Sequence, residues 1–128
     1  MHTEYIQQIT TLDPSRPISL QAQECIKTIL EGLNTGLLRV AEPTENGWTH
    51  HKWVQKAVQL YFKISTVQAH DAPWPHRDLI QKKYPDARSF NDSSVRLVPP
   101  AYVRYGAYIG PSCVLMPCFV NIGAYVGK

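Results

Sequence analysis

Residues 102–128 read YVRYGAYIGPSCVLMPCFVNIGAYVGK, and this stretch decides the fold. Bulky side chains recur at every sixth position, namely Tyr102, Tyr108, Val114, Val120 and Val126. Small side chains follow the first four of these after four residues, namely Gly106, Ser112, Cys118 and Ala124. A six-residue period of this kind is the signature of a parallel β-helix, in which each hexad forms one side of a triangular coil. We therefore predict that the bulky residues point into the coil and the small ones lie near its corners.

An alternative interpretation is a pair of ordinary β-hairpins rich in Gly, Pro and Tyr, but the in-phase repetition of large and small residues favours the coil. One turn of a triangular coil uses three hexads, so residues 95–128 hold little more than one turn. Repeats that cannot bury their own face need about three copies to be stable. We expect that Lys128 is not the end of a self-sufficient domain, and that the chain is a truncated fragment or is completed by partner chains.

Length and composition exclude several classes of protein. With 128 residues, 44% of them apolar, the chain holds one domain, or a small domain and the start of another. The net charge is +3 and the Lys and Arg residues are scattered, so we expect no nucleic-acid partner. No run approaches the ~18 apolar residues of a membrane span, and no signal peptide is recognisable. Three cysteines without a CxxC pair argue against a disulfide framework or a zinc site and favour the cytoplasm.

The first part of the chain has the pattern of two helices and a strand. An apolar patch over residues 5–12 predicts a short helix that ends at Asp13-Pro14. Ser19 is a suitable N-cap for a second helix, and Gly36 is a suitable stop. Residues 37–41 read as a strand, and residues 45–48 as a turn. The second helix has one apolar stripe: Cys25, Ile26, Ile29, Leu30 and Leu33.

A third helix is predicted from His50 to Ile64, followed by an irregular, proline-containing connector over residues 65–94. Within the connector, residues 78–84 are predicted as a short helix. Residues 95–98 read as a strand ended by two prolines. The fold class is therefore an α/β N-terminal domain over residues 1–94 followed by the start of a left-handed parallel β-helix over residues 95–128. The third helix has this predicted inner face: Trp53, Ala57, Val58, Tyr61 and Phe62.

No complete active site can be recognised from motifs. The sequence lacks a Gly-rich phosphate loop, an HExxH helix and a nucleophile elbow. His50 and His51 are adjacent, so they cannot share one helix face as a metal pair, and no metal site is predicted. His70 and His76 flank Pro-Trp-Pro in a predicted loop and are interpreted as structural or surface residues. Trp48 and Trp53 are interpreted as core residues.

Arg96 is the candidate binding residue. It lies in the apolar run 95–98, directly before the coil, where a charged side chain is costly unless it is paired. One interpretation is an exposed position of an alternating strand. The other is a carboxylate clamp, since a guanidinium binds a carboxylate through two hydrogen bonds. Arg104 is a weaker candidate, because it lies within the coil, where charged residues usually face solvent.

Three stretches resemble the tetrahydrodipicolinate N-succinyltransferase family. They are GLLRVAE (residues 36–42), NGWTHHKWVQKAVQLYFKI (residues 46–64) and VRLVPPAYVRYGAYIGPSCVLMPCFVNIGAYV (residues 95–126). The VPP before the hexads and the VNIGAYV run are the most specific parts of the match, and residues 65–94 match poorly.

The resemblance implies a cytoplasmic homotrimeric acyltransferase of the diaminopimelate route to lysine. Such an enzyme moves a succinyl group from succinyl-CoA, its co-substrate, to the amino nitrogen of tetrahydrodipicolinate, a cyclic dicarboxylic acid. No bound cofactor and no membrane or nucleic-acid partner is implied. The family's substrate-binding arginine, in its VRxVPP motif, falls on Arg96. Active sites in the family lie between neighbouring β-helices, where positioning of two substrates and a proton-accepting carboxylate carry the reaction.

The family's acidic catalytic residue and its CoA-binding coils are expected to follow residue 128, so no catalytic residue is assigned here. The 128-residue chain alone is therefore expected to be inactive. Two alternatives remain open at this stage. One is a related acyltransferase acting on another amino acid, for which the poorly matching residues 65–94 leave room. The other is a non-catalytic trimerising module or one subunit of a split enzyme.

Overall fold

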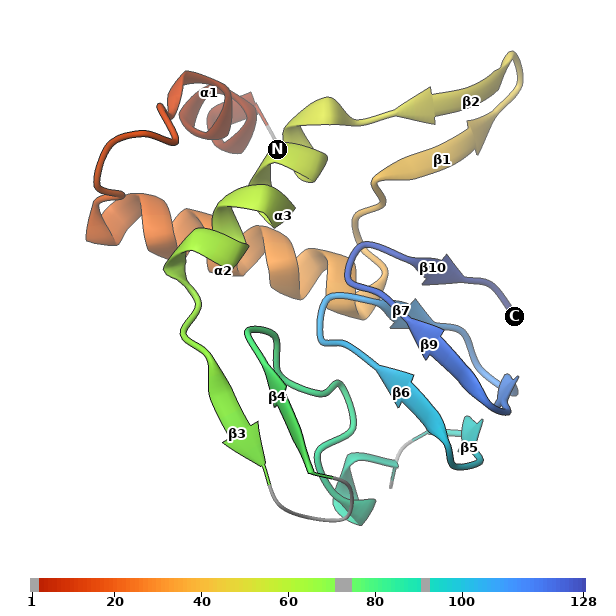
Figure 1. Ribbon diagram of the computed structural model, residues 1–128. Helices are drawn as coiled ribbons and strands as arrows, with labels where there is room; N and C mark the ends of the chain where they lie inside the picture. Colours follow the sequence, from red (N-terminus) through yellow and green to blue (C-terminus); the bar gives the residue numbers. More distant parts are fainter. Residues whose placement is uncertain (1–2, 71–74, 91–92) are drawn as a thin grey trace.

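The computed structural model describes residues 3–70, 75–90 and 93–128 of the chain, shown in Figure 1. The helices are α1 (Thr3–Thr11), α2 (Leu20–Thr35), α3 (Lys52–Ile64) and a short 3-10 helix (Ala87–Phe90). Residues 95–128 are called the coil region below. Four strands precede it: β1 (Ala41–Thr44), β2 (Gly47–His50), β3 (Gln68–His70) and β4 (His76–Asp78). Six short strands follow: β5 (Arg96–Leu97), β6 (Ala101–Val103), β7 (Tyr108–Ile109), β8 (Val114–Leu115), β9 (Cys118–Val120) and β10 (Tyr125–Val126).

Three helices pack on one another around α2, as Figure 1 shows. The predicted start and stop of α2 are confirmed. The Ala22 N–H donates to the Ser19 hydroxyl at 3.3 Å, and Gly36 takes a left-handed conformation with φ of 81° while its N–H donates to the Leu33 carbonyl. The predicted stripe of α2 is buried, and Ile9 of α1 joins it. This apolar core holds the N-terminal half of the chain together.

The third helix is also confirmed, with its inner face turned slightly from the prediction. Val54, Ala57 and Leu60 are its buried residues. Among the predicted residues Ala57 is fully buried, and the others pack half-buried around the same core: Trp53, Val58, Tyr61 and Phe62.

The strand predicted at residues 37–41 is misplaced. Leu37 is 83% exposed, and the Leu38 N–H donates to the Gly32 carbonyl at 3.0 Å, so this segment finishes the end of α2 instead of joining a sheet. The strand begins at Ala41 and forms the β1–β2 hairpin. The turn predicted at residues 45–48 is confined to residues 45–46, and Gly47 and Trp48 begin β2. The assignment of Trp48 to the core is wrong: its side chain lies on this hairpin and is 75% exposed.

The helix predicted at residues 78–84 is wrong. Asp78 ends β4, and the following residues run antiparallel to β6: the Lys83 N–H donates to the Val103 carbonyl at 2.9 Å and the Tyr105 N–H donates to the Gln81 carbonyl at 2.8 Å. Edge pairing to β6 thus replaces local helical bonds. His70 and His76 also lie in paired strands, β3 and β4, and not in a loop. Pro73 and Trp74, which we placed in that loop, lie outside the described residues.

Residues 95–128 form three two-stranded parallel sheets. β5 pairs with β8, β6 with β9, and β7 with β10. Partners in the first pair lie eighteen residues apart, as for Arg96 and Val114. In the other two pairs they lie seventeen apart, as for Tyr102 with Phe119 and Tyr108 with Tyr125. The chain therefore returns over itself after each third strand, and the strands of one pass lie beside those of the next.

The predicted inward positions are wrong by one residue in the first three hexads. Val114 is 47% exposed whereas its neighbour Leu115 is 8% exposed. Since successive residues of a strand face opposite sides, this shift reverses the faces of Tyr102 and Tyr108 as well, which are only half-buried. The residues that pack together inside are Leu97, Val103, Ile109, Leu115, Val120 and Val126, and the small residues among them are Ala101, Ala107, Cys113, Cys118 and Ala124.

One shortened spacing between inward residues explains why the sequence is compatible with both the predicted and the observed set of inward positions. The inward residues are six apart except between Leu115 and Val120, which are five apart. The predicted inward positions therefore agree with the structure from Val120 onward, and before Val120 they are wrong by one residue. Tyr102 and Tyr108 are large enough to imitate inward residues, but their rings stack on the outward rings of the paired strands, Phe119 and Tyr125.

The end of α2 is fastened to the coil by Asn34. Its side-chain oxygen accepts from the Lys83 ammonium at 2.8 Å and from the Gly106 N–H at 3.3 Å, and its carbonyl accepts from Lys83 at 2.7 Å. Beside it, a Cβ on Gly36 would lie 2.7 Å from the Tyr108 ring. Helix, connector and coil therefore meet at one point with no room for an added methyl group.

We predict that Gly36→Ala destabilises the chain by about 1–3 kcal/mol, because the left-handed backbone and the Tyr108 ring both oppose a side chain. Gly127→Ala is the matched control, since nothing lies within 4 Å of the added methyl group. Urea unfolding followed by circular dichroism measures both. Equal midpoints for the two variants would contradict this description of the contact.

Candidate functional site

Arg96, the predicted binding residue, lies on the outer surface of the coil region. Its backbone is fixed, because the Arg96 N–H donates to the Cys113 carbonyl at 2.9 Å and the Val98 N–H donates to the Leu115 carbonyl at 2.8 Å. The side chain is exposed, and it takes part in none of the ion pairs found among the described residues. The guanidinium thus stands on a rigid strand with its hydrogen-bond donors available to a ligand.

Arg104, the weaker candidate, is occupied by structural contacts. Its Nε and Nη2 donate to the two carboxylate oxygens of Asp78 at 2.9 and 2.8 Å, and its Nη1 donates to the Asn121 side chain at 2.9 Å. The guanidinium also lies 5.6 Å from the Phe62 ring and 5.4 Å from the Phe119 ring. Arg104 therefore connects α3, β4 and the coil region.

Burial alone would raise the pKa of the Asp78 carboxyl, but the hydrogen bonds from Arg104 and from the backbone N–H groups of Ile80 and Leu79 outweigh it, and the pKa lies below the ordinary value. The two side chains are 20% and 18% exposed, so the pair is largely shielded from solvent. No sequence signal identifies this pair, because only the fold brings residues 78 and 104 together.

We predict that Asp78→Asn destabilises the protein by about 1.5–3 kcal/mol at neutral pH, since it leaves the Arg104 charge poorly paired. Because the folded-state pKa of Asp78 is lowered, this contribution is fully present above a pH of about 4 and is lost as the pH falls through the lowered pKa. Urea midpoints between pH 2.5 and 7 measure it, with Asp86→Asn as an exposed control. A gap between wild type and Asp78→Asn that stays constant down to pH 2.5 would contradict the assignment.

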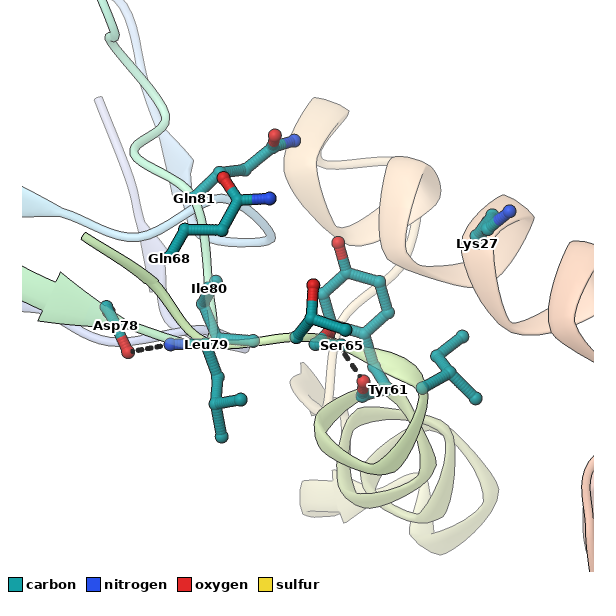
Figure 2. A pocket seen from close by; sticks show the side chains of 10 residues that line it. Lys27, Tyr61, Ser65, Gln68, Asp78, Leu79, Ile80 and Gln81 are labelled. Atoms are coloured by element: carbon teal, nitrogen blue, oxygen red, sulfur yellow. Dashed lines mark hydrogen bonds between the residues drawn. The ribbon is translucent and has the colours of Figure 1, made fainter. Parts of the chain in front are cut away.

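A pocket of about 200 Å³ lies between the end of α3 and the β3–β4 hairpin, shown in Figure 2. The Tyr61 ring, the Ser65 hydroxyl and the amides of Gln68 and Gln81 line it. Burial raises the pKa of Tyr61, so its hydroxyl stays protonated at neutral pH. The pocket's cation, Lys27, is paired with Glu24 at 2.8 Å. These groups can hydrogen-bond a small polar molecule, but they do not pair a nucleophile with a base.

A second pocket, of about 180 Å³, lies beside the run that contains Arg96. Leu97 and Pro99 belong to its lining, together with Lys82 and the Tyr84 and Phe90 rings, which stack 4.3 Å apart. The Tyr102 hydroxyl close by is buried, and none of the described residues forms a hydrogen bond with it. The sequence did not indicate this pocket, because part of its lining comes from residues 82–90 of the connector, whose fold against β6 we did not predict.

The remaining sequence candidates have structural or surface positions. His51 precedes α3 and its Nε2 lies 2.9 Å from a Glu42 carboxylate oxygen, while His50 is exposed. His76 contacts the Tyr102 ring edge-on at 5.6 Å. Within the described residues, no group of three or more His, Cys, Asp and Glu side chains gathers as metal ligands would, and the cysteines are free thiols. No described helix has the length and apolarity that crossing a membrane requires.

Comparison with known proteins finds one similar family. Residues 5–64 match the family described as tetrahydrodipicolinate N-succinyltransferase N-terminal. The chain is similar to the N-terminal part of the tetrahydrodipicolinate N-succinyltransferase family. This confirms the resemblance found in the sequence.

Curated relatives extend the match beyond residue 64. The chain is 45% identical over 107 residues to the 2,3,4,5-tetrahydropyridine-2,6-dicarboxylate N-succinyltransferase of Xylella fastidiosa, which covers 80% of this chain and 39% of the relative. It is 47% identical over 102 residues to the enzyme of the same name from Legionella pneumophila, and this match covers 77% of this chain and 37% of the relative. It is 41% identical over 111 residues to the enzyme of that name from Haemophilus influenzae, and this match covers 84% of this chain and 40% of the relative. The chain thus spans about two fifths of the length of these relatives.

Proposed function

We propose that this chain is the N-terminal part of an N-succinyltransferase of the diaminopimelate route to lysine, working in the cytoplasm. The observation that carries the proposal is the 40–47% identity to enzymes named for succinyl transfer to tetrahydropyridine-2,6-dicarboxylate. The acyl donor is succinyl-CoA and the acceptor is the cyclic dicarboxylic acid.

The proposed reaction consumes an imine, a water molecule and a thioester, and it yields a ketone, an amide and a thiol. Water adds to the ring C=N bond and opens the ring to a ketone and a free amine. The amine nitrogen attacks the thioester carbonyl, a C–N bond forms, and the C–S bond breaks to release the thiol of CoA. The amine must lose one proton, which a neighbouring base accepts. Binding both substrates in line is the main task of the protein.

Arg96 is proposed to bind one carboxylate of the acceptor. Three observations support this role. Its side chain is exposed, its backbone is fixed on both sides by hydrogen bonds to β8 and the residues next to it, and none of the described carboxylates occupies it. A guanidinium held in this way can accept a carboxylate through two parallel hydrogen bonds without a large ordering cost.

The proposed architecture has an α/β part over residues 1–94 and the first turns of a left-handed parallel β-helix over residues 95–128. Support comes from the three parallel strand pairs and from the inward residues that recur at about six-residue steps. A homotrimer is part of the proposal. The outer surface supports it: Val114, Met116 and Phe119 are 47%, 57% and 58% exposed, and such apolar patches commonly mark protein interfaces.

We predict that Arg96→Ala in the full expressed protein lowers kcat/KM for the dicarboxylic acceptor by about 10- to 200-fold, which corresponds to losing charged hydrogen bonds worth ~1.5–3 kcal/mol. Arg96→Lys keeps the charge but loses the two-pronged geometry, and it should recover only part of the rate. Release of the CoA thiol, followed with a thiol-reactive dye, measures both.

Arg88→Ala is the matched control, because Arg88 is exposed and its ion pair with Asp86 lies at the surface. An unchanged rate in Arg96→Ala, or an equal loss in Arg88→Ala, would remove Arg96 from the site. Absence of thiol release with succinyl-CoA and the acceptor in the wild-type full protein would overturn the proposed reaction itself.

We also predict that the 128-residue polypeptide alone transfers no succinyl group. It matches only about two fifths of the relatives' length, and the pockets described above pair no nucleophile with a base. The same dye assay, run with the isolated polypeptide at high concentration, tests this. Turnover above the enzyme-free rate, abolished by Arg96→Ala, would show that these residues suffice.

A further inference from the structure

The tip of the β1–β2 hairpin carries an asparagine followed by a glycine. Asn46 is the second residue of the turn 45–46, and Gly47 is the first residue of β2. All residues of both strands except Glu42 are exposed, and in Figure 1 the tip extends away from the helices and from the coil region. A two-stranded hairpin with no layer against it is marginally stable in water, so its tip opens readily. Solvent therefore reaches both residues.

The backbone around Gly47 leaves room for a reaction between the two residues. The backbone nitrogen that follows an asparagine can attack the side-chain carbonyl carbon and close a five-membered imide. A side chain on the attacking residue hinders this approach, because it crowds the nitrogen. Gly47 has no side chain, its φ is 115°, and nothing lies within 4 Å of the position that a Cβ would occupy. Ring closure is therefore sterically open at this position.

The Asn46 side chain is also able to rotate toward the attacking nitrogen. The side-chain hydrogen bond at the tip joins the Thr44 hydroxyl to the Gly47 carbonyl and does not involve the Asn46 amide. Within the part of the chain that the structure describes, no residue forms a hydrogen bond with the Asn46 side chain, which is exposed. No contact among these residues has to break before the amide reaches the reactive geometry.

Two other described asparagines have neither property. The Asn34 side chain is held by the hydrogen bonds described above, and the residue after it, Thr35, is β-branched. The Asn121 oxygen accepts hydrogen bonds from Arg104 and from the Ile122 N–H, both at 2.9 Å, and Ile122 is β-branched and buried. A held amide and a stiff, branched neighbour both oppose ring closure. The structure thus distinguishes the asparagine at the hairpin tip from these two.

We propose that Asn46 is a site of spontaneous deamidation, with water as the only co-reactant. The Gly47 nitrogen attacks the side-chain carbonyl carbon of Asn46, a C–N bond forms, and the bond from that carbon to the side-chain nitrogen breaks. Ammonia leaves with the proton of the Gly47 N–H. Water then opens the imide at one of its two carbonyl carbons. Opening at the side-chain carbon gives aspartate, and opening at the main-chain carbon gives isoaspartate.

Both products change the hairpin. Aspartate adds a negative charge beside Glu45 at the tip. Isoaspartate carries the main chain through the side-chain carbon and lengthens it by one methylene group, which disrupts the pairing of Thr44 with Gly47. The modification is independent of the proposed transferase reaction, because it involves neither Arg96 nor the lining of the two pockets described above.

Incubation of the full expressed protein at neutral and at mildly alkaline pH, followed by peptide mass spectrometry, tests the proposal. We expect peptides that contain position 46 to exchange the amide for a carboxylate. The reaction should be faster at the higher pH, because the attacking nitrogen must lose its proton. Isoaspartate, detected by enzymatic methylation of its free carboxylate, should accompany aspartate. Peptides that contain Asn34 and Asn121 are internal controls and should keep their amides.

Two variants separate the ring-closure chemistry from the exposure of the tip. Gly47→Ala places a methyl group on the attacking residue and should slow amide loss by about tenfold or more, a barrier increase of ~1.4 kcal/mol. The positive φ disfavours alanine here, but a loosened tip would speed a reaction limited by exposure, so slower loss reports the methyl group itself. Asn46→Gln keeps an exposed amide but requires a six-membered ring, and it should keep that amide.

Three outcomes would overturn the proposal. The first is amide loss at position 46 that is no faster than at Asn34 and Asn121. The second is an equal rate of loss in the wild type and in Gly47→Ala. The third is aspartate at position 46 without isoaspartate, since direct hydrolysis of the side chain passes through no imide.

Discussion

The structure depends on one polar contact at the end of α2. Asn34 accepts hydrogen bonds from Lys83 of the connector and from the Gly106 N–H of the coil region, so three segments distant in sequence meet at one amide. Lys83 is half-buried there, and burial is the main reason that the pKa of its ammonium group is lowered. A buried ammonium group is costly unless its donors are satisfied, and the last carbonyls of a helix are suitable acceptors. The contact thus completes the helix and anchors the coil at the same time.

Everything proposed about function follows from this anchoring. The coil region buries only a small apolar cluster of small and branched side chains. Asn34 fixes one side of it and the Arg104–Asp78 pair fixes another, so the short strand that bears Arg96 is held by the packed helices. A binding residue needs such support to meet a carboxylate in the right orientation. Of two arginines eight residues apart, Arg104 is used for support, and Arg96 is the one proposed to bind a ligand.

The sequence predicted the elements with strong local signals. The helix ends at Ser19 and Gly36 and the turn at residues 45–46 depend on neighbouring residues alone, and they are correct. The inward positions before Val120 were predicted wrongly for two reasons. The inward residues Leu115 and Val120 are five residues apart instead of six, and the large tyrosine side chains resemble buried residues. The segment 78–84 depends on pairing with β6, a distant partner that no local pattern reveals. The strand after α2 starts later than predicted because the Leu38 N–H completes the end of the helix. Arg96 was selected by its motif and its binding role stays a prediction, whereas the contacts around it arise only from the fold.

Native-state hydrogen exchange tests most directly whether the helices and the coil region form one cooperative unit. Peptides covering residues 20–36 and 101–109 are followed by mass spectrometry at increasing urea concentrations. The account predicts that the slowest amides of both peptides reach the same opening free energy, and that Asn34→Ala lowers it for residues 101–109 first. Complete exchange of residues 101–109 in the wild type while α2 stays protected would contradict it, since the coil region would then open without the helices.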